Sequence, residues 1–239
     1  MYQNLKGQKV LVAGGTGGLG RAVSLAFLAE QARVFVTYRA DAEFAALKKD
    51  AGAAAGLLEG YPVDVTDEAV VRGLVERLVA DHGGVDALVN TVGGYAAGKS
   101  LWETEPGVLE KMLTLNLRVG YLLARAVVPV MLRQGSGAIV NVAARAAVDH
   151  AAGAFAYAAS KAAAVAMMDS LAADLKGTGV RVNSVLPSII DTEVNRKAMP
   201  QADFAKWPKP EEIASVILFL CSREGKVVDG AAVPVYGGQ

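Results

Sequence analysis

Short apolar runs alternate with longer mixed segments along the whole chain. The apolar runs are rich in Val, Ile and Leu with little polar alternation, which is typical of strands buried on both faces of a sheet. They predict strands over residues 9–13, 33–38, 57–63, 85–90, 137–142, 180–186 and 231–235. The segments between them have helical periodicity and predict helices near 18–31, 41–50, 67–82, 107–133, 155–176 and 210–222.

This alternation predicts a fold class. Strand–helix–strand units join parallel strands through right-handed crossovers, and their helices cover both faces of the sheet. We therefore expect an α/β, three-layer, doubly wound sandwich with a seven-stranded parallel sheet. No linker or repeat divides residues 1–239, which predicts a single domain. Ligands of such sheets bind beyond the carboxyl ends of the strands, at the topological switch point.

One segment interrupts the alternation. Residues 187–210 show no clear period, and Pro187, Pro200, Pro208 and Pro210 punctuate them. A long irregular segment in a compact protein often forms a binding loop. Because it follows the sixth predicted strand, we expect 187–210 to be a substrate lid on the ligand side of the sheet.

Composition excludes several classes of protein. The chain has 24 Lys and Arg residues and 24 Asp and Glu residues, so no basic excess indicates a nucleic-acid partner. The single cysteine, Cys221, cannot form an internal disulfide, and no metal site is expected. No signal-peptide region and no apolar stretch of roughly 20 residues is evident, which predicts a cytoplasmic protein without a membrane partner.

A glycine-rich turn follows the first predicted strand. Its sequence is Gly14-Gly15-Thr16-Gly17-Gly18-Leu19-Gly20. Between a strand and a helix, such a turn lets backbone N–H groups approach a pyrophosphate at the helix N-terminus. The spacing differs from the dinucleotide fingerprint G-x-G-x-x-G, and a merely tight turn is the alternative.

Tyr157 and Lys161 lie four residues apart in a predicted helix and therefore share one of its faces. There the ammonium would lower the phenol pKa and make it a usable proton donor. A dinucleotide beside such a tyrosine suggests hydride transfer coupled to proton transfer. Taken alone, the pair could equally be a half-buried tyrosine and a surface lysine. Ser160, next to Lys161, is expected to pack away from this face.

The end of the second predicted strand bears on the choice of cofactor. An acidic residue there would bind the ribose hydroxyls of NAD and repel a 2′-phosphate, but this chain has Tyr38 and Arg39. A guanidinium suits a phosphate as a bidentate donor. We expect NADP(H) to be preferred, with NAD(H) as the alternative, unless Arg39 is solvated or pairs with Asp41.

Together these motifs resemble the short-chain dehydrogenase/reductase family over essentially the full length, which implies a Rossmann-type oxidoreductase. The resemblance implies that Tyr157, Lys161 and Asn116 are catalytic and that a dinucleotide is bound by the turn and the strand ends. The implied cofactor-binding residues are Gly14, Thr16, Gly17, Gly18, Leu19, Gly20, Tyr38, Arg39, Asp64, Val65, Asn90, Gly93, Pro187 and Thr192. It also implies a small-molecule substrate and a homodimer or homotetramer built from the 107–133 and 155–176 helices.

The chain departs from the family pattern at one position. The family has a serine about thirteen residues before the tyrosine, where it holds the substrate oxygen, but this chain has Ala144 there and no hydroxyl from Val142 to Ala147. Losing one donor to a developing oxyanion costs roughly 3–4 kcal/mol. Either the enzyme is impaired or its acceptor does not need that donor, as for a quinonoid or imine-like group.

A narrower resemblance favours such an acceptor. Quinonoid dihydropteridine reductases also have alanine at this position. They share with this chain an Asn-Arg-Lys-x-Met-Pro-x-Ala-Asp-Phe run, here residues 195–204, and an aromatic after two glycines, here Tyr95. The branch usually has an acidic residue where this chain has Tyr38 and Arg39. Residues expected to touch the substrate are Tyr95, Ala144, His150, Met199 and Trp207.

We therefore expect an NADP(H)-dependent reductase of a conjugated, quinonoid or carbonyl acceptor, most specifically quinonoid dihydropterin. A reductase of small ketones or aldehydes, and a nucleotide sensor or scaffold with little turnover, are the alternatives. Trp207 could instead anchor the lid to the core, and His150 could be a solvated loop residue. Arg145 could contact a substrate or cap the strand end.

Overall fold

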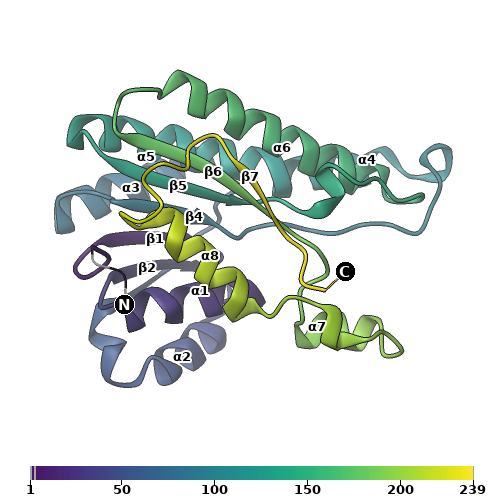
Figure 1. Ribbon diagram of the computed structural model, residues 1–239, viewed down its shortest axis with the longest axis horizontal. Coiled ribbons are helices and arrows are strands. Elements are labelled where there is room, and N and C mark those ends of the chain that lie inside the picture. Colours follow the sequence, from purple (N-terminus) through teal and green to yellow (C-terminus); the bar gives the residue numbers. More distant parts are fainter. Residues whose placement is uncertain (1, 3, 239) are drawn as a thin grey trace.

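The computed structural model describes residue 2 and residues 4–238, and one parallel sheet runs through it (Figure 1). The strands follow in the order β3-β2-β1-β4-β5-β6-β7. Their bounds are β1 Lys9–Ala13, β2 Arg33–Tyr38, β3 Leu58–Pro62, β4 Ala87–Asn90, β5 Gly137–Val142, β6 Val180–Pro187 and β7 Ala232–Val235. The predicted seven-stranded parallel sheet is confirmed, with strand ends within two residues of those expected.

Helices cover both faces of this sheet (Figure 1). Helices α1 and α8 pack together on one face, and α3 and α5 pack together on the other. The helix bounds are α1 Gly18–Ala29, α2 Asp41–Asp50, α3 Glu68–His82, α4 Pro106–Leu113, α5 Val119–Gln134, α6 Phe155–Asp174, α7 Glu193–Ala198 and α8 Pro210–Cys221. The predicted three-layer α/β sandwich is therefore confirmed.

The first strand shows why these runs are apolar throughout. Successive side chains of a strand point to opposite faces. Val10 and Val12 belong to the core cluster under α1 and α8, whereas Leu11 and Ala13 belong to the cluster under α3 and α5. Because helices bury both faces, no position on the strand is left for a polar side chain.

The switch point lies between β1 and β4. The chain leaves β1 toward β2 and later returns on the other side of β1 as β4, with Ala13 opposite Asn90 at their carboxyl ends. The connections after these two strands therefore diverge and leave room for a ligand between them. The glycine-rich turn follows β1 at this point.

The predicted continuous helix over 107–133 is wrong in one respect. Between α4 and α5, residues Thr114–Arg118 form a π-helical turn, and the Val119 N–H bonds to the Thr114 carbonyl five residues earlier. A π turn holds one more residue than an α turn, so apolar periodicity alone does not reveal it. Asn116 lies within this turn.

The expectation that no apolar stretch could span a membrane also needs correction. The 29-residue helical stretch Pro106–Gln134 is long and apolar enough by length and composition. Half of its most apolar window is buried within the protein, and α5 packs on β4, β5 and α3. Its apolar character therefore reflects its place in the core.

The predicted lid, 187–210, contains more regular structure than its sequence suggested. Helix α7 and a 3₁₀ turn at Phe204–Lys206 lie within it. Thr192 caps α7 by accepting a bond from the Asn195 N–H, and Asp203 caps the 3₁₀ turn through the Ala205 N–H. Elements this short are set by their caps and show no hydrophobic period. Further 3₁₀ turns lie at Gly52–Leu57, Leu101–Glu103 and Arg145–Ala147.

Candidate active site

The turn after β1 is shaped by the lack of side chains. Gly14 has a φ of +74°, a backbone conformation that other residues rarely adopt. A Cβ atom on Gly20 would collide with the Gly14 carbonyl oxygen, and one on Gly15 would collide with Val36. Gly15 is not among the residues that the family resemblance predicts to bind the cofactor. The turn therefore brings its backbone closer to β2 and α1 than any other residue would allow.

Two threonines fix this turn. The Thr37 hydroxyl at the end of β2 accepts a 2.9 Å bond from the Gly14 N–H. The Thr91 hydroxyl after β4 donates to the Ala13 carbonyl at 2.7 Å and lies 3.1 Å from the Gly14 carbonyl. Both were missed by the sequence analysis, because single threonines near strand ends have no distinctive pattern.

The N-terminus of α1 fits a pyrophosphate. Its N-cap, Gly17, has no side chain to accept a bond from the free N–H groups, and the first turn contains no acidic residue. Uncapped N–H groups at the positive end of a helix dipole form an anion site. The residues present after β1 are therefore those that a dinucleotide requires.

The residues expected at the adenine end lie at or just after the carboxyl ends of β2 and β3. The Tyr38 ring stacks on Phe44 with centroids 4.8 Å apart. Its pKa is raised by burial and by a hydrogen bond to Asp41, so Asp41 faces Tyr38. Arg39 is exposed. Asp64, also exposed, has its pKa lowered by bonds from the Thr66 N–H and hydroxyl, whereas Val65 is buried in the core.

Thr16 points toward the same end. Its hydroxyl donates a 2.8 Å bond to the Glu43 carboxylate of α2. Gly18 faces the opposite direction, since a Cβ atom there would lie 3.1 Å from Thr192 of the predicted lid. Leu19 is buried against the core, so its side chain packs inside and only its backbone faces the turn. The turn thus touches both the adenine end and the lid.

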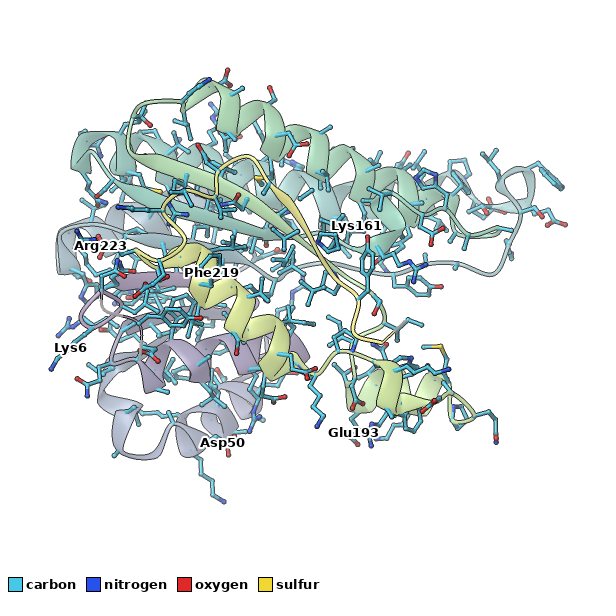
Figure 2. All side chains as sticks on the ribbon, viewed as in Figure 1. Lys6, Asp50, Lys161, Glu193, Phe219 and Arg223 are labelled. Carbon is cyan, nitrogen blue, oxygen red and sulfur yellow. The ribbon has the colours of Figure 1, made fainter. Side chains whose placement is uncertain are left out.

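Lys161 of α6 is buried and only 5% exposed (labelled in Figure 2). Its ammonium donates a 2.9 Å bond to the carbonyl of Val142, the last residue of β5. Burial lowers the pKa of Lys161 to about 8. This charge is therefore held by a single carbonyl oxygen among the contacts of the described residues, which leaves it ready for further acceptors.

Tyr157 shows a pKa shift opposite to the predicted one. Burial, and in second place Tyr95, raise the pKa of Tyr157 to about 12. The prediction that Lys161 lowers the phenol pKa is therefore wrong for this structure: loss of hydration raises this pKa, and the Lys161 ammonium is directed to the Val142 carbonyl. The phenol is consequently protonated at neutral pH.

Tyr95 lies directly against Tyr157. The two ring centroids are 4.9 Å apart at an interplanar angle of 76°, an edge-to-face contact. Tyr95 is 72% exposed, so most of its ring faces solvent beside the phenol. The structure therefore brings this predicted substrate residue to the predicted proton donor.

Asn116 connects three segments. Its Oδ1 accepts a 2.9 Å bond from the Gly94 N–H, and its Nδ2 donates to the Gly94 carbonyl at 3.0 Å and to the Ser160 hydroxyl at 2.9 Å. A Cβ atom on Gly93 would lie 2.9 Å from Asn116 Oδ1 and 3.2 Å from Lys161 Nζ. The predicted Ser160 orientation, packed away from the site, is thus wrong: its hydroxyl belongs to this network.

Asn90 is buried at the carboxyl end of β4. It is 1% exposed, and its Nδ2 donates a 2.8 Å bond to Asn141 Oδ1 on β5. Its Oδ1 accepts a bond from the Val92 N–H, which shapes the start of the segment leading to Gly93. Asn90 therefore positions the backbone after β4, and its side chain is already occupied by protein contacts.

Ala144 makes the position of the expected serine hydroxyl apolar. Ala144 is 7% exposed and begins the 3₁₀ turn Arg145–Ala147. Arg145 pairs with Asp149 at 2.8 Å, and its guanidinium lies over the Tyr236 ring at 5.1 Å. It therefore joins the end of β5 to the C-terminal segment. His150 is exposed in the following loop.

Side chains of the predicted lid, 187–210, form ion-pair and ring contacts with one another. Asp191 forms a bidentate pair with Arg196, whose guanidinium lies 4.8 Å from the Phe204 ring centroid. The Phe204 ring in turn packs against the Trp207 ring, with the ring centroids 5.0 Å apart. Trp207 is only 6% exposed, which agrees with the alternative that it anchors the lid, and its contact with substrate stays a prediction.

Two other residues of the predicted lid, Pro187 and Met199, are buried to different degrees. Pro187 is buried at the end of β6, and Met199 is partly buried at the end of α7. Figure 2 shows Lys161 and the α7 residue Glu193 toward the same end of the molecule. Thr192, which precedes α7, lies close to Gly18 of the turn after β1.

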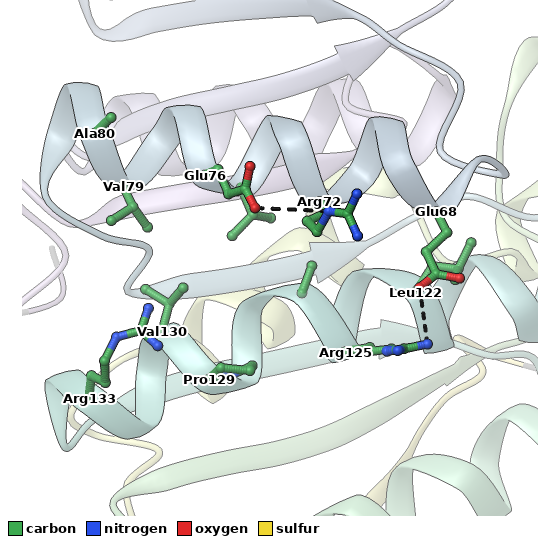
Figure 3. A pocket seen from close by; sticks show the side chains of 12 residues that line it. Glu68, Arg72, Glu76, Val79, Ala80, Leu122, Arg125, Pro129, Val130 and Arg133 are labelled. Atoms are coloured by element: carbon green, nitrogen blue, oxygen red, sulfur yellow. Dashed lines mark ion pairs between the residues drawn. The ribbon is translucent and has the colours of Figure 1, made fainter.

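A hollow of about 450 Å³ lies elsewhere, between α3 and α5 (Figure 3). The ion pairs Arg72–Glu76 and Glu68–Arg125 lie along it. It contains none of the predicted site residues. Among the described residues, no group of three or more His, Cys, Asp or Glu side chains is arranged to hold a metal ion.

Comparison with known proteins identifies the family. The model of the short chain dehydrogenases matches residues 8–203. The chain is 32% identical over 242 residues to a 3-oxoacyl-(acyl-carrier-protein) reductase of Thermotoga maritima, covering 98% of each chain. It is 34% identical over 244 residues to a D-threitol dehydrogenase of Mycolicibacterium smegmatis, covering 98% of this chain and 93% of the relative.

A solved structure leads to the same conclusion. ElxO with NADP bound superimposes with a TM-score of 0.91 at 25% identity, covering 97% of this chain and 98% of that chain. None of these three proteins is described as a pterin reductase, so the narrower resemblance stays a hypothesis. The nicotinamide cofactor expected from the glycine-rich turn agrees with all of these findings. The chain therefore belongs to the short chain dehydrogenases, a family of NAD(P)H-dependent oxidoreductases.

Proposed function

We propose that this protein is an NADP(H)-dependent reductase of a planar, conjugated acceptor, with quinonoid dihydropterin as the first candidate. The supporting observation is the make-up of the site around Tyr157: a ring edge from Tyr95 on one side, and Ala144 in place of a hydroxyl. Such a site offers one proton donor and flat apolar surfaces. It suits a ring system better than an isolated ketone.

The cofactor would lie along the switch point. The turn from Gly14 to Gly20 would take the pyrophosphate, Arg39 the 2′-phosphate, and Asp64 and Val65 the adenine. Asn90, Gly93, Pro187 and Thr192 would line the nicotinamide side. When bound, the reduced nicotinamide supplies the hydride.

Tyr157 would donate the proton. Burial raises the pKa of the Tyr157 phenol to about 12, so the phenol is protonated at neutral pH, and efficient proton donation requires that its pKa be lowered toward the working pH when cofactor and substrate are bound. Lys161 would place its ammonium beneath the site, where a positive charge stabilises the phenolate that forms on proton transfer. Asn116 would hold the wall formed by Gly93 and Gly94 against these two residues.

Ala144 would limit the range of acceptors. Without a hydroxyl, one positioned donor to the substrate oxygen is lost, roughly 3–4 kcal/mol of transition-state stabilisation for a ketone. A quinonoid acceptor regains conjugation on reduction and develops less charge on that oxygen. Tyr157 alone would then suffice.

The test is the oxidation of NADPH and of NADH with quinonoid dihydropterin generated in the assay, followed by the absorbance of the reduced nicotinamide. Fast turnover with NADPH above NADH is expected. Tight NADPH binding in the same sample with no turnover would contradict the pterin proposal. It would leave a nucleotide sensor or an untested carbonyl acceptor.

A reductase of small ketones or aldehydes is the second candidate, favoured by the relatives, which are named for a 3-oxoacyl thioester and a sugar alcohol. Ala144→Ser discriminates the two. It should raise ketone turnover about a hundredfold in a carbonyl reductase and change pterin turnover little. Ala143→Ser, at the adjacent buried position, is the matched control.

Assembly is a separate proposal. The outer faces of α5 and α6 would join copies of the chain into a homodimer or homotetramer. Exposed Tyr121 and Leu132 on α5 are apolar groups that such contacts would cover. Sedimentation of the purified protein gives the number of subunits, and a monomer at micromolar concentration would contradict this proposal.

A further inference from the structure

Ser160 carries the most informative contacts that the proposed mechanism does not use. It is fully buried on α6, between Tyr157 and Lys161. Its hydroxyl lies 2.9 Å from Asn116 Nδ2 and 2.7 Å from the Tyr157 carbonyl oxygen. A single oxygen therefore joins the π turn before α5 to the first turns of the catalytic helix.

The direction of each bond follows from the donors present. Gly94 offers one N–H and one carbonyl, and both face the Asn116 amide. The Asn116 Oδ1 must lie on the N–H side and its Nδ2 on the carbonyl side, which fixes the amide orientation. The second Nδ2 proton must then go to the Ser160 oxygen, because among the described residues the remaining acceptor near it is the Met112 sulfur at 3.8 Å. Ser160 directs its own proton to the Tyr157 carbonyl.

The chain of bonds ends at the reacting side chains. Gly93 packs against both Asn116 and Lys161, so the 93–95 segment cannot move without disturbing the lysine. Tyr95, two residues further, contacts the Tyr157 ring. A shift of Asn116 would therefore move the wall that faces substrate relative to the proton donor.

We propose that Ser160 is a positioning residue: it fixes Asn116, and through Asn116 the 93–95 segment, against Tyr157 and Lys161. This deepens the proposed function and rests on the roles given there to Tyr157 and Lys161. Removing the hydroxyl leaves an Asn116 N–H buried without an oxygen acceptor, and buried donors without partners are costly. The network then relaxes toward other arrangements.

The test compares Ser160→Ala with Ser222→Ala. Ser222 is a matched control: it is 1% exposed and its hydroxyl donates at 2.8 Å to the carbonyl three residues earlier, but it has no contact with the site. Ser160→Ala should lower kcat by about ten- to a hundredfold, with the NADPH Kd unchanged within about twofold. Ser222→Ala should leave kcat unchanged, even if its melting temperature falls.

Two further variants separate positioning from stability. Asn116→Ala should lower kcat by a similar factor, and the double variant should lose little more than the worse single one, because both act through the same bond. Ser160→Thr, which keeps the hydroxyl, should recover most of the lost kcat. Equal losses of kcat in Ser160→Ala and Ser222→Ala, or additive losses in the double variant, would overturn the proposal.

Hydrogen exchange tests the same contact without turnover. The Gly94 N–H is protected by Asn116, so amides in 91–96 should exchange faster in Ser160→Ala than in the wild type and in Ser222→Ala. If the wild-type protein reduces neither pterin nor carbonyl acceptors, the proposed function fails and this measurement still decides on Ser160. Unchanged exchange would overturn its positioning role.

Discussion

The turn after β1 and the segment after β4 lie side by side at the carboxyl ends of two central strands, but different interactions hold them in place. The first is rich in glycines, of which Gly15 and Gly20 leave no room for a Cβ atom, and it is held by the hydroxyls of Thr37 and Thr91. The second is held by buried amide and hydroxyl groups, with Asn116 bonded to Gly94 and Ser160. One wall depends on the absence of side chains and the other on their exact pairing.

This difference predicts how each wall fails. A wall made of backbone is damaged by adding atoms, and the loss should appear in cofactor binding. A wall made of paired polar groups is damaged by removing atoms, and the loss should appear in turnover. Four variants test the contrast, in order of decreasing effect.

Tyr157→Phe removes the proposed proton donor and keeps the ring contact with Tyr95. We expect kcat to fall by about 10²- to 10⁴-fold while NADPH binding stays unchanged, since only the general acid is lost. Steady-state kinetics and fluorescence titration with NADPH measure both. Tyr61→Phe, on the other half of the sheet, should keep full activity. A sensor without turnover would show no difference between the two.

Gly20→Ala adds one methyl group to the backbone wall. Because its Cβ would collide with the Gly14 carbonyl, the turn must shift, and the NADPH Kd should rise about tenfold or more. Gly73→Ala, in α3 where a Cβ meets nothing within 4 Å, should bind NADPH normally and gain about 0.5–1 kcal/mol of stability. Equal NADPH binding by the two variants would contradict the steric account of the turn.

Lys161 links stability to pH. Its pKa is lowered from 10.5 to about 8 in the folded protein, so between pH 8 and 10.5 the unfolded chain holds more protons than the native one. The contribution of Lys161 to the stability of the protein without cofactor should therefore rise with pH across this window, by up to about 3 kcal/mol, whereas the raised pKa values of Cys221 and Tyr157 act in the opposite direction above about pH 9. Lys161→Met should remove that rise. Denaturant unfolding of both proteins from pH 7 to 10 checks it, because the contributions of Cys221 and Tyr157 are common to both and cancel in the difference; parallel pH profiles of the two proteins would contradict it.

Arg39→Ala tests the proposed contact between Arg39 and the 2′-phosphate of NADP(H). The side chain is exposed, and losing one charge-assisted contact to a 2′-phosphate should raise the KM for NADPH about tenfold and leave that for NADH unchanged. Arg72→Ala, which removes an exposed arginine from α3, is the control. Equal effects on both cofactors would mean that Arg39 does not select NADP(H).

The backbone wall was predictable because its signal is local. Gly14, Gly18 and Gly20 stand in consecutive sequence after a buried strand, and the strand pattern itself follows from burial on both faces. The order of strands and the helix layers come from the same pattern. Even here Thr37 and Thr91 were missed, since their contacts join segments that are far apart in the sequence.

The polar wall was predictable only in part. Tyr157, Lys161 and Asn116 were found by resemblance, but the bond between Asn116 and Ser160 spans 44 residues and leaves no spacing pattern. The pKa of Tyr157 was predicted with the wrong sign, because the i, i+4 rule places the lysine near the phenol but says nothing of how deeply both are buried. For Trp207 the sequence left two roles open, substrate contact and lid anchor, and its burial favours the anchor.

The π turn at Thr114–Arg118 has a consequence for the register of the long helical stretch around it. One extra residue per turn shifts the sequence by one place against the helix faces, about 100° of rotation. The segment before the turn contacts α6, whereas the segment after it contacts α3. A heptad or 3.6-residue pattern fitted across both segments is therefore out of phase in one of them. Deleting a single residue from 114–118 would restore one uninterrupted α-helix and turn one of its ends away from the neighbours it now packs on.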